Sequence, residues 1–346
     1  LLPIVAAGTT FMDGGTANWR FTMLLTGVIA AIYGVIYFNS VTDTPPGKEY
    51  KRPKKYGAME VTSRGDFYGL LIMNFGLIFF FFLLAWRLAQ KKLHFLNAGQ
   101  MYFIWVLLAG LYAYQTYQAW LVNRDVVLGR KKFAPAERYQ FSQVALLQLT
   151  YITNFGSELA AVSMLPVFFE KTFGLDHAHA AMVAATYPFL NLFSRPSGGL
   201  ISDKLGSRKW TMTIVSGLIG ISYLAAYLID KTWALPLAVV VTMFSALFAQ
   251  AGCGGTFAIV PLIKKEITGQ VAGNVGAYGN FGGVVYLTIF SLTDAPTLFA
   301  TMGISALICA FLCAFFLKEP QNSFGMDTIP EAQPMPIPSS EFGISD

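Results

Sequence analysis

One arginine lies inside an apolar stretch of the chain, where a charged side chain is costly. Arg195 follows the apolar run Phe189–Phe193, and a guanidinium at the centre of a bilayer costs at least about 2.5–3.5 kcal/mol. Such an arginine normally faces a bundle interior or a water-filled cavity and has an anionic partner. We therefore expect Arg195 to belong to an anion-binding site.

Polar and aromatic side chains share one face of an earlier apolar segment. Tyr151, Asn154, Phe155 and Glu158 follow each other at i, i+3, i+4 and i+7, the spacing of one helix face. This face should line a cavity rather than contact lipid. Two interpretations of Glu158 stay open: a carboxylate that relays protons, or a structural partner of Arg195 or of other groups in the bundle. Core packing would equally explain Tyr151 and Phe155.

Glycine and asparagine are concentrated in a late apolar segment. Five glycines occur between Gly273 and Gly283, together with Asn274 and Asn280. Each glycine in a helix costs up to about 1 kcal/mol relative to alanine, so their presence needs a reason. Close helix packing is one reason. The other is that bare backbone and amide side chains approach a small ligand, with Gly276 and Asn280 as candidates.

The composition is that of an integral membrane protein. Of the 346 residues, 55% are hydrophobic and 12% are charged, and the mean hydropathy is +0.53, far above that of a soluble domain. Because a spanning helix needs about 20 apolar residues, we predict an all-α fold with nine spans. They are 17–39, 67–90, 101–123, 141–170, 177–201, 209–229, 234–260, 270–292 and 296–317.

The basic residues lie mainly in loops on one predicted side of the membrane. With loop 40–66 in the cytoplasm, strict alternation gives the cytoplasmic side about three times as many Lys and Arg residues as the other side. This asymmetry follows the positive-inside rule and predicts a cytoplasmic C-terminus. The run of lysines between residues 48 and 55 is expected to contact anionic lipid. The formal charge of +5 is thereby explained without nucleic acid.

No cofactor or metal is expected. Cys253, Cys309 and Cys313 lie in apolar segments, and His94, His177 and His179 do not form a metal-ligand spacing with them. Asp176 precedes a predicted helix and is better placed as its N-cap than as a ligand. A nucleophile and base set is also missing, which argues against an enzyme.

A charged glycine motif separates two of the predicted spans. Gly199, Asp203, Lys204, Gly206, Arg208 and Lys209 occur in this order. Glycine permits a tight turn between helices, and Arg208 or Lys209 can pair with Asp203 or with helix ends. This pattern resembles the cytoplasmic loop signature of the major facilitator superfamily, in which it follows the second helix of each six-helix half.

That resemblance implies a domain organisation. Residues 141–317 resemble the complete C-terminal half, and 1–39, with a last helix at 17–39, the end of the N-terminal half. The connection 40–140 would hold two extra spanning helices, 67–90 and 101–123. We expect 318–346 to be a disordered cytoplasmic tail. Leu1–Thr10 resembles the end of an earlier helix, so we expect the sequence to be a fragment.

Together with Arg195, the glycine and asparagine segment resembles the nitrate signature of the nitrate/nitrite porters within that superfamily. The resemblance implies that Arg195, Tyr151 and Phe155 contact the substrate, with Asn154, Gly276 and Asn280 nearby. It implies proton-coupled transport of nitrate, with nitrite as a second substrate, by alternating access in a cell-membrane monomer. Glu158 is the candidate for proton coupling.

The chain departs from that family in one respect. Family members carry a second arginine in the N-terminal half and a first glycine and asparagine signature, and neither is present here. Two other functions therefore stay open: another carrier of the superfamily, such as a proton/drug antiporter, and a sensor that binds nitrate without moving it.

Overall fold

The computed structural model describes residues 19–42, 57–90, 95–134 and 137–320, and its regular secondary structure there is helical throughout. Seven of its helices are long and apolar enough to cross a membrane. The predicted all-α membrane architecture is confirmed. The expectations for Leu1–Thr10, for the lysine run between residues 48 and 55 and for the tail beyond residue 320 fall outside the described residues.

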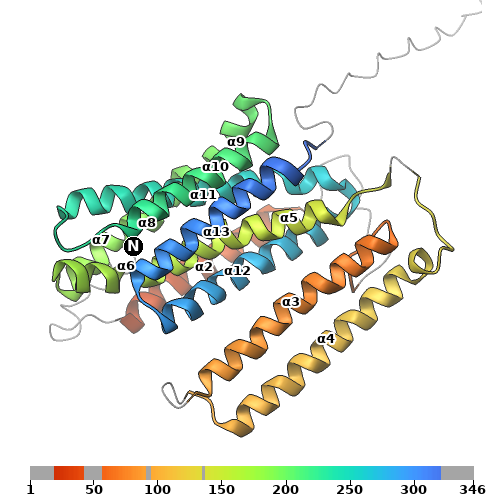
Figure 1. Cartoon of the computed structure of the whole chain (residues 1–346), viewed down its shortest axis with the longest axis horizontal. Helices are drawn as coiled ribbons and strands as arrows, with labels where there is room; N and C mark the ends of the chain where they lie inside the picture. The colour runs from red at the N-terminus through yellow and green to blue at the C-terminus, as the bar shows by residue number, and fades with distance from the viewer. Residues whose placement is uncertain (1–18, 43–56, 91–94, 135–136, 321–346) are drawn as a thin grey trace, which may run out of the picture.

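The helices form a bundle with a hairpin beside it (Figure 1). The first three are α2 (Trp19–Ser40), α3 (Arg64–Leu88) and α4 (Ala98–Val127). The bundle contains α5 (Phe141–Tyr151), a π-turn η3 (Ile152–Gly156), α6 (Ser157–Phe173), α7 (His177–Ala184), α8 (Thr186–Phe189), α9 (Asn191–Leu205), α10 (Arg208–Tyr227), α11 (Leu235–Ile263), the 3₁₀ turn η4 (Lys265–Ile267), α12 (Thr268–Leu292) and α13 (Ala295–Phe316).

Two of the nine predicted spans differ from the expectation. Helix α4 has 30 residues, but its tyrosines, tryptophans and glutamines lower its mean hydropathy. It is therefore not among the seven helices that are apolar enough to span a membrane. The segment 177–201 is not one helix but three, α7, α8 and α9. Pro188 explains part of this break, because proline has no backbone N–H to donate to the preceding turn. Arg195 consequently lies just after a helix start and not in mid-helix.

The predicted helix 141–170 is also interrupted. Five residues, Ile152–Gly156, form a π-turn between α5 and α6, and such turns are often found at functional sites. Gly156 is in close contact with α12, because a Cβ added there would lie 2.6 Å from the Cα of Gly282. The backbone of α12 at Gly282 thus lies directly against Ile152 and Gly156 of the π-turn, and Gly279 lies against the Tyr151 and Phe155 rings.

The hairpin of α3 and α4 is fixed to the bundle at both ends. Before α3, Thr62 donates to the carbonyl of Tyr139 at 2.7 Å, and the Tyr139 hydroxyl donates to the carbonyl of Glu60 at 2.6 Å. Burial raises the pKa of Tyr139, which keeps this hydroxyl a donor. At the other end, Arg87 donates to the carbonyl of Ser291 on α12 at 3.1 Å. The α3–α4 hairpin is therefore packed against the part of the bundle that contains α5 and α12.

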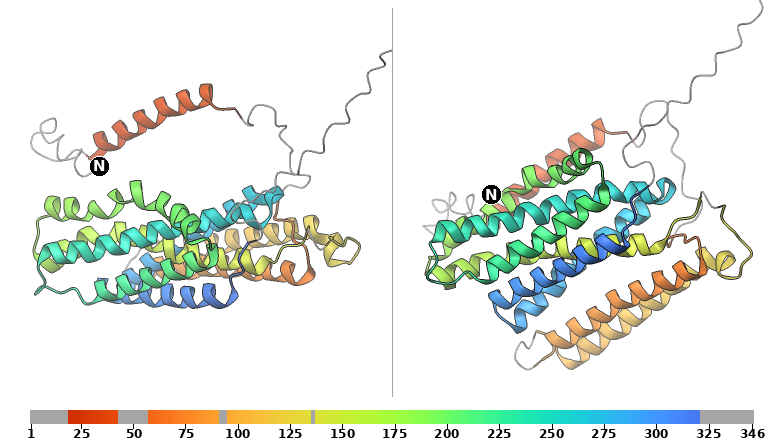
Figure 2. Two further views of the ribbon diagram at one scale, coloured as in Figure 1. Left: turned by 90° about the horizontal axis from the view of Figure 1, so that it is seen from above. Right: turned by 45° about the horizontal axis from the view of Figure 1, so that its top comes forward.

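Helix α2 stands apart from the bundle (Figure 2). All its side chains from Met23 to Ser40 are exposed, and no residue of its apolar window is buried.

Candidate functional site

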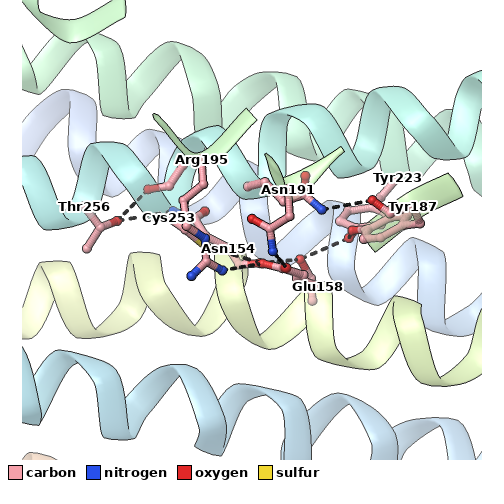
Figure 3. Close-up of polar contacts among 11 residues, drawn as sticks. Asn154, Glu158, Tyr187, Asn191, Arg195, Tyr223, Cys253 and Thr256 are labelled. Carbon is pink, nitrogen blue, oxygen red and sulfur yellow. Dashed lines mark hydrogen bonds and ion pairs between the residues drawn. The ribbon is translucent and has the colours of Figure 1, made fainter. Parts of the chain in front are cut away.

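Arg195 lies between the helices and is paired with a carboxylate (Figure 3). Its Nη2 atom donates to Oε2 of Glu158 at 3.0 Å, and its side chain keeps 38% of its surface exposed while that of Glu158 keeps 6%. The anionic partner expected for a membrane arginine is thus Glu158. The guanidinium is open on one side, and its Nε atom has no hydrogen-bond partner among the described residues.

The Glu158 carboxylate is held by three side chains from two helices. Asn191 on α9 donates to Oε1 at 2.6 Å, Arg195 on the same helix donates to Oε2, and Cys253 on α11 approaches Oε2 at 3.8 Å. The ion pair with Arg195, which was one of the two interpretations of Glu158 from the sequence, is therefore present. It does not decide the proton relay, because a paired carboxylate can still exchange a proton.

Aromatic rings form a wall beside the guanidinium. The rings of Tyr151 and Phe155 stack with centroids 5.2 Å apart and an interplanar angle of 9°, and Cζ of Arg195 lies 5.4 Å from the Phe155 centroid. Phe257 of α11 contacts Tyr151 edge to face at 5.1 Å. Gly279 of α12 lies against the same two stacked rings, and a Cβ there would overlap Tyr151. Glycine at 279 thus leaves room for the stack.

Three other predicted site residues, Asn154, Asn280 and Gly276, are not part of this aromatic wall. Asn154 is fully buried, and its amide approaches Thr256 Oγ1 at 3.4 Å in the contact with α11. Asn280 is exposed and donates to the carbonyl of Gly276 in its own helix at 3.2 Å. A Cβ added at Gly276 would meet no atom within 4 Å. Gly276 therefore has open space beside its backbone.

Other polar groups were not found from the sequence. The hydroxyls of Tyr187 and Tyr223 lie 2.6 Å apart, and Tyr223 donates to Ser157 at 3.1 Å, one residue before Glu158. Asn191 was also missed. It lies four residues before Arg195, the spacing of one helix face, which was the available signal.

The glycine motif after α9 forms a compact turn. Gly206 has a left-handed φ of +64°, where glycine is favoured, and Arg208 pairs with Asp203 at 2.8 Å. Lys204 is exposed at this turn, and Gly199 and Lys209 are partly buried. Glu319, missed from the sequence, caps α10: it accepts from Ser207 Oγ at 2.6 Å and from the backbone of Arg208 and Lys209 at 2.7 and 3.0 Å. A negative charge at a helix N-terminus is stabilising.

Asp176 caps α7 by accepting hydrogen bonds from the backbone of Ala178 and His179 at 3.1 and 3.3 Å. The hydrogen bond with the His179 side chain, and then these backbone hydrogen bonds, lower the pKa of Asp176. An apolar groove of about 660 Å³ lies between α3 and α4 and contains none of the predicted site residues.

Fold and site together define a polytopic helical membrane protein with an ion-pair site between its helices. Residues 147–334 match the family described as Major Facilitator Superfamily. The chain belongs to this superfamily and, within it, to the nitrate porter family, as the sequence motifs predicted. It is thus related to carriers and not to enzymes.

Three relatives illustrate this membership. The nitrate/nitrite transporter NrtP of Nostoc punctiforme is 67% identical over 341 residues, which cover 99% of this chain and 68% of that protein. NrtP of Picosynechococcus sp. is 54% identical over 323 residues, with 89% and 60% covered. The high-affinity nitrate transporter 2.3 of Oryza sativa is 36% identical over 151 residues, with 42% and 29% covered. The chain thus spans about two thirds of the first relative.

Proposed function

We propose that the protein transports nitrate, with nitrite as a second substrate, across the cell membrane together with protons. The observation that carries this proposal is the partly open guanidinium of Arg195 beside the Phe155 ring, in a chain whose relatives are named nitrate/nitrite transporters. Nitrate is planar and singly charged. An arginine edge offers it two parallel hydrogen bonds, while Phe155 lies against its flat face and Tyr151 offers a hydroxyl.

Proton coupling follows from the charge balance of the pair. In the arrangement described, Glu158 is the counter-ion of Arg195. When a proton neutralises Glu158, Nη2 of Arg195 loses its anionic partner, and nitrate can take that place. The site then holds zero net charge before loading, as carboxylate and guanidinium, and after loading, as guanidinium and nitrate. A site that stays neutral avoids the cost of an unpaired charge in the membrane.

The transport cycle we propose is alternating access, in which two helical halves rock about a site near the bilayer midplane. The tail lies in the cytoplasm, and the protein acts as a multi-pass monomer in the cell membrane. The excess of Lys and Arg in the loops assigned to the cytoplasm supports the orientation.

Substitution of the pair tests the proposal in nitrate uptake by cells that express the full-length protein. Arg195→Lys should raise the half-saturating nitrate concentration at least about tenfold, because a point charge replaces a two-pronged donor. Arg124→Lys is the matched control, since Arg124 is 58% exposed and lies outside the site. Wild-type uptake by Arg195→Lys would contradict the clamp.

Glu158→Gln tests the proton coupling separately. Glutamine resembles a protonated glutamate in shape but cannot exchange a proton, so nitrate binding should persist while uptake loses its dependence on pH. Uptake that stays proton-driven in this variant would remove Glu158 from the coupling step.

A further inference from the structure

Asn191 and Arg195 share the two oxygens of the Glu158 carboxylate. They lie one turn apart on α9, and Asn191 donates to Oε1 at 2.6 Å while Arg195 donates to Oε2 at 3.0 Å. Figure 3 shows both side chains directed at Glu158. The carboxylate is therefore held by one charged donor and one neutral donor from the same helix.

The second polar atom of Asn191 has no such contact. Its Oδ1 atom is buried and has no hydrogen-bond partner among the described residues. Native proteins seldom leave a buried acceptor unpaired, because doing so forfeits the hydrogen bonds it had with water. This unpaired acceptor lies next to a titratable carboxyl. A fitting donor is therefore the O–H group that Glu158 carries only when it is protonated.

We propose that Asn191 is the positioning residue for protonated Glu158, accepting the carboxyl O–H on Oδ1 while its amide N–H keeps its bond to the carboxyl. A protonated carboxyl has one O–H donor and one carbonyl acceptor, and a primary amide offers the complementary pair. When Glu158 is protonated, its Oε2 atom gives up the hydrogen bond from Arg195 and donates its proton in a hydrogen bond to Oδ1 of Asn191. The Nη2 atom of Arg195 is released for the anion. This inference rests on the proposed function.

The other titratable groups around Glu158 do not offer this acceptor. They are Arg195 on α9, Cys253 on α11, Tyr151 on α5, Tyr187 on α8 and Tyr223 on α10. Arginine has no acceptor, and the Cys253 sulfur is 3.8 Å from Oε2. Tyr187 and Tyr223 already hydrogen-bond each other, and Tyr223 also donates to Ser157. Tyr151 makes no hydrogen bond to Glu158 within the described part of the chain. Asn191 is the neutral amide in direct contact with the carboxyl.

The pH dependence of nitrate uptake by the full-length protein tests the inference with Asn191→Leu, which preserves shape but removes donor and acceptor. If Asn191 stabilises the protonated form, its loss should move the half-maximal pH of uptake to lower values by about 0.5–1 unit, the size of one hydrogen bond. If its N–H merely held the ionised carboxylate, the shift would be alkaline. An alkaline shift or an unchanged profile overturns the inference.

Two further variants keep the test decisive. Should Asn191→Leu fail to accumulate in the membrane, Asn191→Ala and Asn191→Ser replace it: the acid shift is expected for alanine and should be smaller for serine, whose hydroxyl still accepts. In the Glu158→Gln background, Asn191→Leu should leave the pH profile flat. If Glu158→Gln itself keeps the pH dependence, the proposed coupling fails. If Glu158→Gln loses the pH dependence but Asn191→Leu keeps the wild-type pH profile, the inference about Asn191 fails.

Discussion

The ion pair of Arg195 and Glu158 keeps an arginine in an apolar bundle, and it is also the feature on which the proposed transport depends. Replacing a buried pair by apolar residues can be neutral, whereas removal of one partner typically costs about 3–5 kcal/mol, because a charge is left uncompensated. Arg195 is partly exposed, which reduces that cost. A carrier needs this balance, since its counter-ion must be exchangeable.

At the same scale, substitution by alanine should affect the stability of the protein differently at two glycines of α12. Gly276→Ala should not destabilise the protein, because the added Cβ meets no atom within 4 Å; if nitrate passes there, the half-saturating nitrate concentration should rise severalfold. Gly279→Ala should lower the melting temperature, since its Cβ overlaps the Tyr151 ring. Thermal unfolding in detergent and nitrate uptake measure the two effects.

A lower melting temperature for Gly276→Ala would show that packing and not ligand space explains this glycine. Unchanged uptake in a stable Gly276→Ala protein would remove Gly276 from the site.

At the scale of helices, the sequence predicted the elements better than their interruptions. Polar residues in apolar segments indicated Glu158 and Arg195, because burying a charge is so costly that few positions can hold one. The π-turn at Ile152–Gly156 and the break before Asn191 were not predicted, because both depend on contacts with helices distant in the sequence. For the same reason Asn154, expected in the cavity face, lies buried against α11.

The contact between α9 and α11 should tolerate no side chain at Gly254. A Cβ there would overlap the backbone carbonyl of Arg195, and backbone cannot move aside as a flexible side chain can. Gly254→Ala should therefore destabilise the protein by about 1–3 kcal/mol, as overpacking does, and impair nitrate binding by displacing Arg195. Thermal unfolding and binding assays measure both.

Gly269→Ala is the matched control for Gly254→Ala. Gly269 is a helical, exposed glycine with open space around it, so alanine should be neutral or slightly stabilising there. Equal melting temperatures for the two variants would mean that α9 and α11 are not in the close contact described.

The α3–α4 hairpin should stabilise α12 through aromatic contacts. Phe281 of α12 meets Phe80 at 5.2 Å and Phe81 at 6.0 Å, and an aromatic pair is worth about 0.5–1.5 kcal/mol. Phe281→Ala should raise hydrogen exchange in α12 around Gly276–Gly283, measured by mass spectrometry. Phe79→Ala removes an exposed ring of α3 and should leave that exchange unchanged. Equal exchange in both variants would contradict the bracing role.

At the scale of the whole molecule, the proposed orientation depends on the positive charge of the loops between the spans. The predicted spans 67–90 and 101–123 would preserve the sidedness of everything that follows them, because their number is even. Four predicted spans, 141–170, 177–201, 209–229 and 234–260, separate the basic loop before α5 from the one after α11, so both loops belong on one side of the membrane. The positive-inside rule assigns that side to the cytoplasm.

Cysteine labelling should locate the two ends of α11 on opposite sides. Lys231 and Lys265 are exposed and flank this 29-residue helix, which at 1.5 Å per residue spans about 44 Å. In intact cells a membrane-impermeant maleimide should label Lys231→Cys but not Lys265→Cys, which should react only after permeabilisation. The native Cys253, Cys309 and Cys313 are buried and should give little background. The reverse pattern would invert the orientation, and labelling of both in intact cells would mean that α11 does not span the membrane.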